Sequence, residues 1–290
     1  MATSRSLFKK YYQLAKPGII YGNALVAIGA FFLAEKGHFN ATLFLAMLFG
    51  LCLIIASGCV FNNYFDRGID AKMKRTKKRS LVTGEVPLTS ALIYATALGA
   101  IGIILLATYT NILTLAAALV GLFFYVIVYG YTKRTTVYGT LVGSVAGAVP
   151  PVVGYCAVTN RFDAAALILF LILVIWQMPH FYAIAMFRHE DYAAARLPVL
   201  PVVHGNAITK VHLLAYIIAF ALAAAALTFF GYTHFVYLAV MLLLSLYWLR
   251  QAIQGFSTNN DTLWARSVFR SSLIILTAFC VLIGINAWLP

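Results

Sequence analysis

The chain alternates long apolar stretches with short polar connections along its length. A bilayer hydrocarbon core about 30 Å thick requires about 20 apolar residues per helix, and nine stretches approach that length. The pattern predicts an all-α integral membrane protein, a bundle of about nine transmembrane helices. The predicted spans are Gly18–Ala34, Leu43–Tyr64, Leu88–Thr108, Ile112–Tyr131, Val137–Ala157, Ala164–Phe187, Val211–Phe230, Phe235–Leu249 and Ser271–Leu289.

Composition supports a lipid environment for the whole chain. Of 290 residues, 63% are hydrophobic and only 10% are charged, which is more apolar surface than a soluble domain of this size needs. The sequence contains no evident linker, internal repeat or low-complexity segment, so we expect a single domain over residues 1–290. The four cysteines lie inside apolar segments without metal-type spacing, and we interpret them as buried hydrophobic residues.

The net charge of +13 follows the predicted topology. With the N-terminus in the cytoplasm, all but two of the 21 Lys and Arg residues fall on the cytoplasmic side, the exceptions being Lys36 and Arg161. This is the bias that orients membrane proteins. The charge therefore predicts an orientation and gives no reason to expect a nucleic-acid partner.

A stripe of polar residues ends the second predicted span. Asn62, Asp66 and Asp70 are spaced by four, so on a continuing helix they share one face, about 6 Å apart along the axis. Two carboxylates at that distance repel by roughly 2–3 kcal/mol at an effective dielectric near 20, so we expect a cation between them. Mg²⁺ takes carboxylate oxygens and is commonly shared with substrate phosphates. The alternative is a helix end whose polar residues have simply reached the interface.

A basic segment, Lys72–Arg79, follows the acidic stripe directly. Positive-inside topology alone could account for it. Beside metal-binding acids, however, guanidinium groups form a phosphate site, and Arg75 and Arg79 would share a helix face. Lys133 and Arg134, in the next inside loop, could contribute from across the bundle.

A second long inside loop carries Glu190 and Asp191 directly after Arg188. These acids could complete a second metal site on the same membrane face, because long loops on one face tend to carry function. Equally, they could be solvated ends of the neighbouring helices.

The span before that loop contains His180 and Gln177, one turn apart and close to Trp176. A histidine inside a span, directly after Pro179, could be a heme ligand or a proton carrier. The alternative is a core histidine that satisfies backbone groups freed by the proline. Pro150-Pro151 in the fifth span predicts a broken helix and a cavity.

These motifs resemble those of the UbiA-type intramembrane prenyltransferases, and within them the branch whose prenyl acceptor is heme. The residues that match the first aspartate-rich motif of that superfamily are Asn62, Asp66, Arg67, Asp70, Arg75, Thr76 and Arg79. The stretches that resemble the heme branch are Leu14–Gly18, Ala56–Cys59, Val137–Thr140, Pro150-Pro151, Trp176–His180 and Leu200–Val202.

The resemblance implies nine helices around a central cavity, with Mg²⁺ and diphosphate at its cytoplasmic mouth, in a bacterial-type cytoplasmic (inner) membrane. It implies transfer of farnesyl from farnesyl diphosphate to the 2-vinyl group of heme b with addition of water, giving heme O and diphosphate. A terminal oxidase assembly is an implied partner. The implied metal ligands are Asn62, Asp66, Asp70 and Asp191, of which the three aspartates are also the implied catalytic residues. The implied diphosphate contacts are Arg67, Arg75, Arg79, Lys133 and Arg134, and the implied heme contacts are Trp176, Gln177 and His180.

One departure from the superfamily pattern concerns the second acidic motif. Many UbiA-type enzymes have a second pair of aspartates spaced by four, but here Ala195 stands four residues after Asp191, which leaves Glu190 to substitute. Two alternatives stay open: a prenyltransferase for a quinone precursor such as 4-hydroxybenzoate, and a cation-coupled transporter. The segment around His180 argues against the first. The absence of an internal repeat and of an acid near the bilayer midplane argues against the second.

Overall fold

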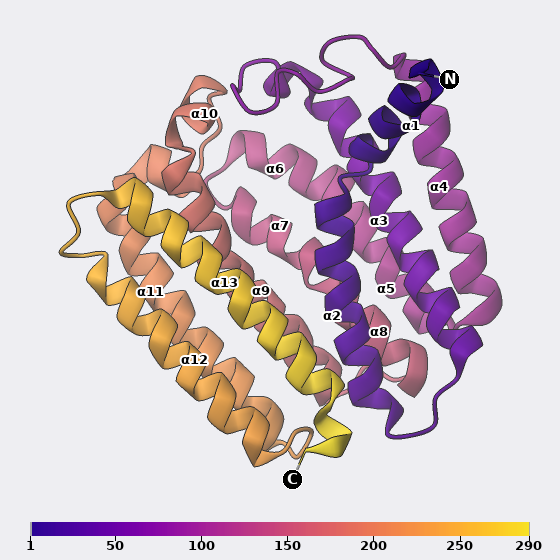
Figure 1. Ribbon diagram of the computed structural model, residues 1–290, viewed down its shortest axis with the longest axis vertical. Coiled ribbons are helices and arrows are strands. Elements are labelled where there is room, and N and C mark those ends of the chain that lie inside the picture. The colour runs from indigo at the N-terminus through magenta and orange to yellow at the C-terminus, as the bar shows by residue number, and fades with distance from the viewer. Residues whose placement is uncertain (1, 290) are drawn as a thin grey trace.

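The computed structural model describes the backbone of residues 2–289 and the side chains of residues 7–289, and every regular element in that part is a helix (Figure 1). Figure 1 shows one bundle, with α1 and the loop after α3 at the end opposite the C-terminus. The α-helices are α1 (Ala2–Leu14), α2 (Pro17–Glu35), α3 (Ala41–Asp70), α4 (Leu88–Tyr109), α5 (Ile112–Phe123), α6 (Tyr129–Thr135), α7 (Gly139–Gly147), α8 (Val149–Thr159), α9 (Ala164–Phe187), α10 (His189–Ala194), α11 (Leu200–Phe229), α12 (Phe235–Gln254) and α13 (Asp261–Gly284). A π-helix, η1 (Phe124–Val128), joins α5 to α6, and a 3₁₀ turn, η2 (Asn286–Trp288), follows α13.

The predicted number of spans is confirmed. Within residues 2–289, nine helical segments are long and apolar enough to cross a membrane. The fourth is α5, η1 and α6 in continuation, and the fifth is α7 followed by α8. The break predicted at Pro150-Pro151 is also present: α7 ends at Gly147, and the prolines occupy the first turn of α8, where a missing N–H costs no hydrogen bond.

Several predicted boundaries were wrong at the end of the bundle that carries α1. Helix α3 extends to Asp70 rather than Tyr64, and α11 begins at Leu200 rather than Val211, with a kink at Gly205, where φ is 78°. The ninth span is Asp261–Gly284 rather than Ser271–Leu289. Hydropathy does not detect these extensions because helices continue past the apolar zone. Helix α13 starts early because the Asn260 side chain accepts a hydrogen bond from the Leu263 amide, a typical N-cap.

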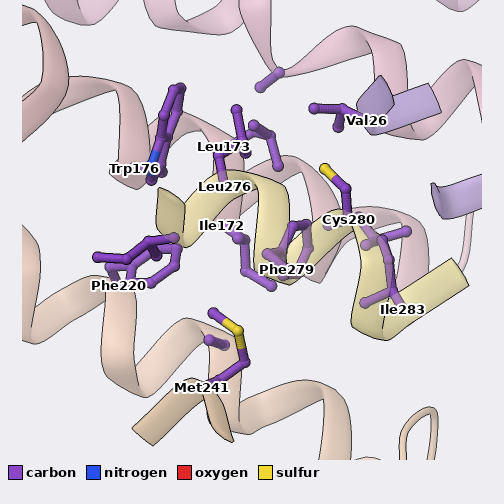
Figure 2. Close-up of a cluster of buried hydrophobic side chains, with 14 of the residues drawn as sticks. Val26, Ile172, Leu173, Trp176, Phe220, Met241, Leu276, Phe279, Cys280 and Ile283 are labelled. Carbon is purple, nitrogen blue, oxygen red and sulfur yellow. The ribbon is translucent and has the colours of Figure 1, made fainter. Parts of the chain in front are cut away.

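The main apolar cluster lies where α9, α11, α12 and α13 meet (Figure 2). In Figure 2, Ile172, Phe220, Met241 and Phe279, one from each helix, lie in the same cluster, and all are essentially inaccessible to solvent. Lipid tails are as apolar as these side chains, so dispersion and close fit, rather than transfer from water, hold such helices together.

Glycines set the closest helix contacts in the other half of the bundle. A Cβ atom added to Gly154 of α8 would lie 2.1 Å from the Ala27 carbonyl oxygen of α2. Gly50 and Gly102 play the same part between α3 and α4, since each faces backbone of the opposite helix. Small residues that let backbones approach are typical of membrane helix interfaces.

Candidate active site

A cavity of about 890 Å³ runs into the bundle between α2, α3, the α5–α6 segment, α7, α9 and α13. Along α3 its lining extends from Leu51 to Asp70, which corresponds to about 28 Å at 1.5 Å rise per residue. The deep part is apolar, with Leu51 and Ile54 among its walls, and the mouth is charged. The cavity could therefore take a long apolar group with a polar head.

The predicted acidic stripe lies at the mouth. Asn62, Asp66 and Asp70 are all buried, and all line the cavity. Since α3 stays helical through Asp70, the spacing of four places them on one face, as the sequence predicted.

Basic side chains from two other segments, α6 and the loop after α3, meet this stripe. Lys133 forms an ion pair with Asp66, and Arg134 Nη2 lies 2.8 Å from the other oxygen of the same carboxylate. Arg79 Nη1 lies 2.6 Å from Asp70 Oδ2. Each of the two carboxylates thus has lysine or arginine partners of its own.

The loop of residues 71–87 is held over the stripe by α3 itself. Arg79 also donates to Asn63 Oδ1 at 3.1 Å, and Asn63 in turn donates to the Leu14 carbonyl at 2.8 Å. Thr76 Oγ1 donates to the Asp70 carbonyl at 2.9 Å. These bonds tie α1, the loop and the end of α3 into one polar network, so the geometry of the mouth depends on all three.

Two predicted diphosphate contacts differ in their placement. Arg75 lines the cavity mouth and is exposed there. Arg67 does not line it: its guanidinium donates to the Tyr64 carbonyl at 2.9 Å and lies 4.9 Å from the centre of the Tyr64 ring. One position after Asp66 on a helix, Arg67 is rotated by about 100° away from the stripe, which explains why the structure does not bring it to the site.

Asp191, which the sequence suggested as a metal ligand, forms a hydrogen bond with a backbone amide. Its side chain is buried outside the cavity lining, and Oδ1 accepts a hydrogen bond from the Lys74 backbone amide at 2.8 Å. The neighbouring Glu190 pairs with the Lys74 ammonium at 3.1 Å, with both groups exposed. The second acidic loop therefore holds residues 71–87 in place.

The donor set fits a magnesium ion that arrives with a phosphate group. In the described part of the chain, no three His, Cys, Asp or Glu side chains lie close enough to form a metal site. Mg²⁺ does not need such a cluster, because it is usually held by one or two carboxylates together with substrate phosphates and water. Asp66 and Asp70, buried and facing the cavity, provide two carboxylates of that kind.

Lys16 is a site residue to which the sequence reading assigned no role. It precedes Pro17, the first residue of α2, in a left-handed backbone conformation with φ of 53°, which is uncommon outside glycine. Its Nζ donates to Asn62 Oδ1 at 2.6 Å and lines the cavity. Burial lowers the pKa of Lys16 to about 8. The sequence feature that could have indicated Lys16 is its position directly before Pro17, at the start of the first span and on the same predicted membrane face as the acidic stripe.

A π-helix shapes the wall between the charged mouth and the apolar interior. Within and just after η1, the rings of Tyr125 and Tyr129 stack with centroids 6.0 Å apart, and Lys133 Nζ lies 4.9 Å from the centre of Tyr129. All three residues line the cavity. Single turns of π-helix are often found at functional sites.

The predicted heme contacts lie on α9, one turn apart, and line the cavity. The rings of Trp176 and His180 stack at 4.7 Å, and both side chains reach Ser272 of α13: His180 Nδ1 lies 2.7 Å from its hydroxyl, and Trp176 Nε1 donates to its carbonyl at 3.0 Å. Gln177 differs, since its amide donates to the Ser144 and Leu173 carbonyls. It joins α9 to α7.

Comparison with known proteins identifies the family. Residues 23–274 match the sequence profile of the UbiA prenyltransferase family. The chain belongs to that family. A protoheme IX farnesyltransferase of Serratia proteamaculans is 52% identical over 97% of this chain and 95% of its own. One of Photorhabdus laumondii is 50% identical over 98% and 97%.

Solved structures of the UbiA type share the fold. A digeranylgeranylglyceryl phosphate synthase structure superposes with a TM-score of 0.80 at 18% identity, covering 97% of this chain and 98% of its own. A UbiA homolog from Archaeoglobus fulgidus bound to GPP and Mg²⁺ gives 0.66 at 16% identity, covering 95% and 99%. The predicted all-helical fold and family are confirmed, and membership of a prenyltransferase family decides against the transporter alternative.

Proposed function

We propose that this protein is an intramembrane prenyltransferase that transfers the farnesyl group of farnesyl diphosphate to a vinyl group of heme b. Water is added in the same reaction, and the products are heme O and diphosphate. The observation that carries this assignment is the 52% identity, over 97% of the chain, to a protein named protoheme IX farnesyltransferase. The form of the cavity agrees with it, because a charged mouth and an apolar interior suit a prenyl diphosphate.

The reaction breaks the bond between C1 of the farnesyl chain and the diphosphate oxygen, which keeps the electron pair. A carbon–carbon bond then forms between C1 and the terminal vinyl carbon of heme. The cation left beside the porphyrin takes up water and releases one proton, which leaves a hydroxyl group. The balance requires no oxidant or reductant.

The mouth would bind and stabilise the departing diphosphate. Lys16, Arg75 and Lys133 line the cavity there, and preorganised positive groups favour the state in which negative charge develops on the leaving group. The apolar walls would keep water from the allylic cation until the new bond has formed. The Tyr125 and Tyr129 rings also line the cavity, next to Lys133.

A divalent metal is part of the proposal. Asn62, Asp66 and Asp70 would hold Mg²⁺ through their oxygen atoms, and the ion would neutralise charge on the diphosphate. Asp191 would act indirectly by holding the loop that carries Arg75 and Arg79, since it binds the Lys74 amide. Arg67 lies outside the cavity lining and has no direct role in this proposal.

The acceptor would lie against α9 and α13. Trp176 and His180 line the cavity there, and an aromatic surface with an imidazole suits a flat metalloporphyrin. We further propose that residues 1–290 form one domain in a cytoplasmic membrane with the mouth in the cytoplasm, since all but two Lys and Arg residues fall on that side. A terminal oxidase that uses heme O would consume the product.

In the deciding experiment, purified full-length protein in liposomes is incubated with heme b, farnesyl diphosphate and Mg²⁺. The porphyrin is then analysed by mass spectrometry. Heme O should appear, and its formation should stop with excess EDTA and resume when Mg²⁺ is restored. A parallel reaction with 4-hydroxybenzoate tests the quinone-precursor alternative. Prenylation of 4-hydroxybenzoate with heme left unchanged would overturn the assignment, and full turnover in EDTA would overturn the metal.

A further inference from the structure

Ser272 of α13 faces His180 of α9 at the wall of the cavity. The distance from Ser272 Oγ to His180 Nδ1 is 2.7 Å, and the distance from the same hydroxyl oxygen to the Phe269 carbonyl oxygen is 2.6 Å. Ser272 is fully buried, and His180 is buried except where it lines the cavity.

Counting protons fixes the direction of both bonds. A carbonyl oxygen can only accept, so the single proton of the Ser272 hydroxyl lies toward Phe269. The hydroxyl oxygen then offers a lone pair to His180, which requires a proton on Nδ1. Because neutral imidazole has one N–H, Nε2 is left with its lone pair free.

The other contacts of His180 hold the ring rather than occupy Nε2. Among residues 7–289, whose side chains the structure describes, no group forms a hydrogen bond with Nε2. Trp176 stacks on the ring at 4.7 Å, and Phe269 lies 4.9 Å away on a tilted plane. An imidazole that donates one N–H to a fixed acceptor and keeps the other nitrogen free has the arrangement found in metal-binding histidines.

We propose that Ser272 is a positioning residue that holds His180 as the Nδ1–H tautomer, so that Nε2 coordinates the iron of the heme substrate. This rests on the proposed function, in which heme is the acceptor. Ser272 contacts both residues of the proposed heme surface, because its carbonyl oxygen also accepts a hydrogen bond from Trp176 Nε1–H at 3.0 Å. The two contacts can be separated: replacing Ser272 by alanine removes the hydroxyl and leaves the carbonyl.

The test compares wild type with Ser272→Ala, Ser272→Thr and His180→Ala, with the buried neighbour Ser271→Ala as the matched control. Nitrogen-15 NMR of histidine-labelled protein without heme reports the tautomer, because protonated and unprotonated ring nitrogens resonate in separate ranges. Titration with ferric heme b then gives the Soret position and affinity.

We expect Ser272→Ala to lose the single Nδ1–H tautomer, to shift the Soret band toward that of His180→Ala and to bind heme about tenfold more weakly. Ser272→Thr and Ser271→Ala should behave as wild type.

The outcomes separate this inference from the proposed function. A wild-type tautomer and spectrum in Ser272→Ala, with a shifted spectrum in His180→Ala, would overturn the role of Ser272 alone. A normal spectrum in His180→Ala would overturn iron coordination, while farnesylation of heme could stand. Failure of the proposed function would appear as no heme O from wild type that binds heme normally, and the binding data would still decide the role of Ser272.

Discussion

Arg79 and Asp70 form an ion pair with 2.6 Å between Nη1 and Oδ2, and this pair holds the loop after α3 against the last turn of α3. The Asp70 side chain is almost fully buried, and the Arg79 side chain is 27% exposed. Removing one partner of a buried pair leaves an uncompensated charge and is strongly destabilising. Variants at the mouth therefore change both chemistry and stability, so activity and melting temperature have to be measured separately.

Asp66→Asn and Asp70→Asn should each lower turnover at least tenfold. Each change removes a negative oxygen from the proposed metal site, and the loss of about 1.4 kcal/mol of transition-state stabilisation corresponds to tenfold in rate. Heme O formation at saturating substrate is the measurement, with the melting temperature recorded beside it. Glu85→Gln, an exposed acid that pairs with Lys10, serves as control. Wild-type rates in folded variants would remove these carboxylates from catalysis.

Arg75→Ala and Arg79→Ala should both raise the apparent KM for farnesyl diphosphate and leave heme affinity unchanged. They should differ in stability. Because Arg75 is exposed at the mouth, its loss should leave the melting temperature near that of wild type. Loss of Arg79 leaves Asp70 and Asn63 without this partner, and should lower the free energy of unfolding by about 1–3 kcal/mol. The exposed Lys77→Ala is the control for charge. Equal losses of heme and diphosphate affinity in the Arg75 variant would mean that the loop has only a structural role.

The acidic stripe could be predicted from sequence because it depends on one helix. A spacing of four defines a face wherever the helix continues, so Asp66 and Asp70 were correctly brought together. The nine spans were correct for a similar reason, since length and hydropathy are local properties. Their ends were less accurate, because caps such as Asn260 extend helices beyond the apolar zone.

Contacts between distant segments could not be predicted in this way. Ser272 lies 92 positions from His180, and a serine in an apolar helix has no pattern that indicates its partner. Lys16 faces Asn62 only because α2 and α3 pack side by side, and Asp191 turned out to bind the Lys74 amide rather than face the cavity. Chemistry predicts which side chains suit a metal or a phosphate, but packing decides which of them reach it.

Lys16→Met should raise the KM for farnesyl diphosphate about tenfold, with heme affinity unchanged. The substitution keeps the length of the side chain and removes a positive charge from the cavity mouth, where loss of one charge-assisted hydrogen bond is worth roughly 1.5–3 kcal/mol. Lys16→Arg keeps the charge and should restore part of the affinity. Lys9→Met, an exposed position on α1, is the matched control. A normal KM in folded Lys16→Met protein would exclude the ammonium group from diphosphate binding.

Gly154→Ala should destabilise the protein, whereas Gly130→Ala should not. Both glycines lie in helices, but a Cβ at Gly154 would sit 2.1 Å from the Ala27 carbonyl oxygen, and one at Gly130 meets nothing within 4 Å. The first clash is with backbone, so α2 and α8 must separate, at a cost of about 1–3 kcal/mol. In Gly130→Ala, better helix propensity should be neutral or favourable by up to about 1 kcal/mol.

The two alanine variants are compared by thermal unfolding in the same detergent, together with the KM for farnesyl diphosphate. Helix α2 begins at Pro17, directly after Lys16, so displacing it should also weaken diphosphate binding in Gly154→Ala. Serine at position 154, slightly larger than alanine, should be at least as damaging. If Gly154→Ala unfolds at the wild-type temperature with a wild-type KM, the close approach of α2 and α8 does not position the mouth of the cavity.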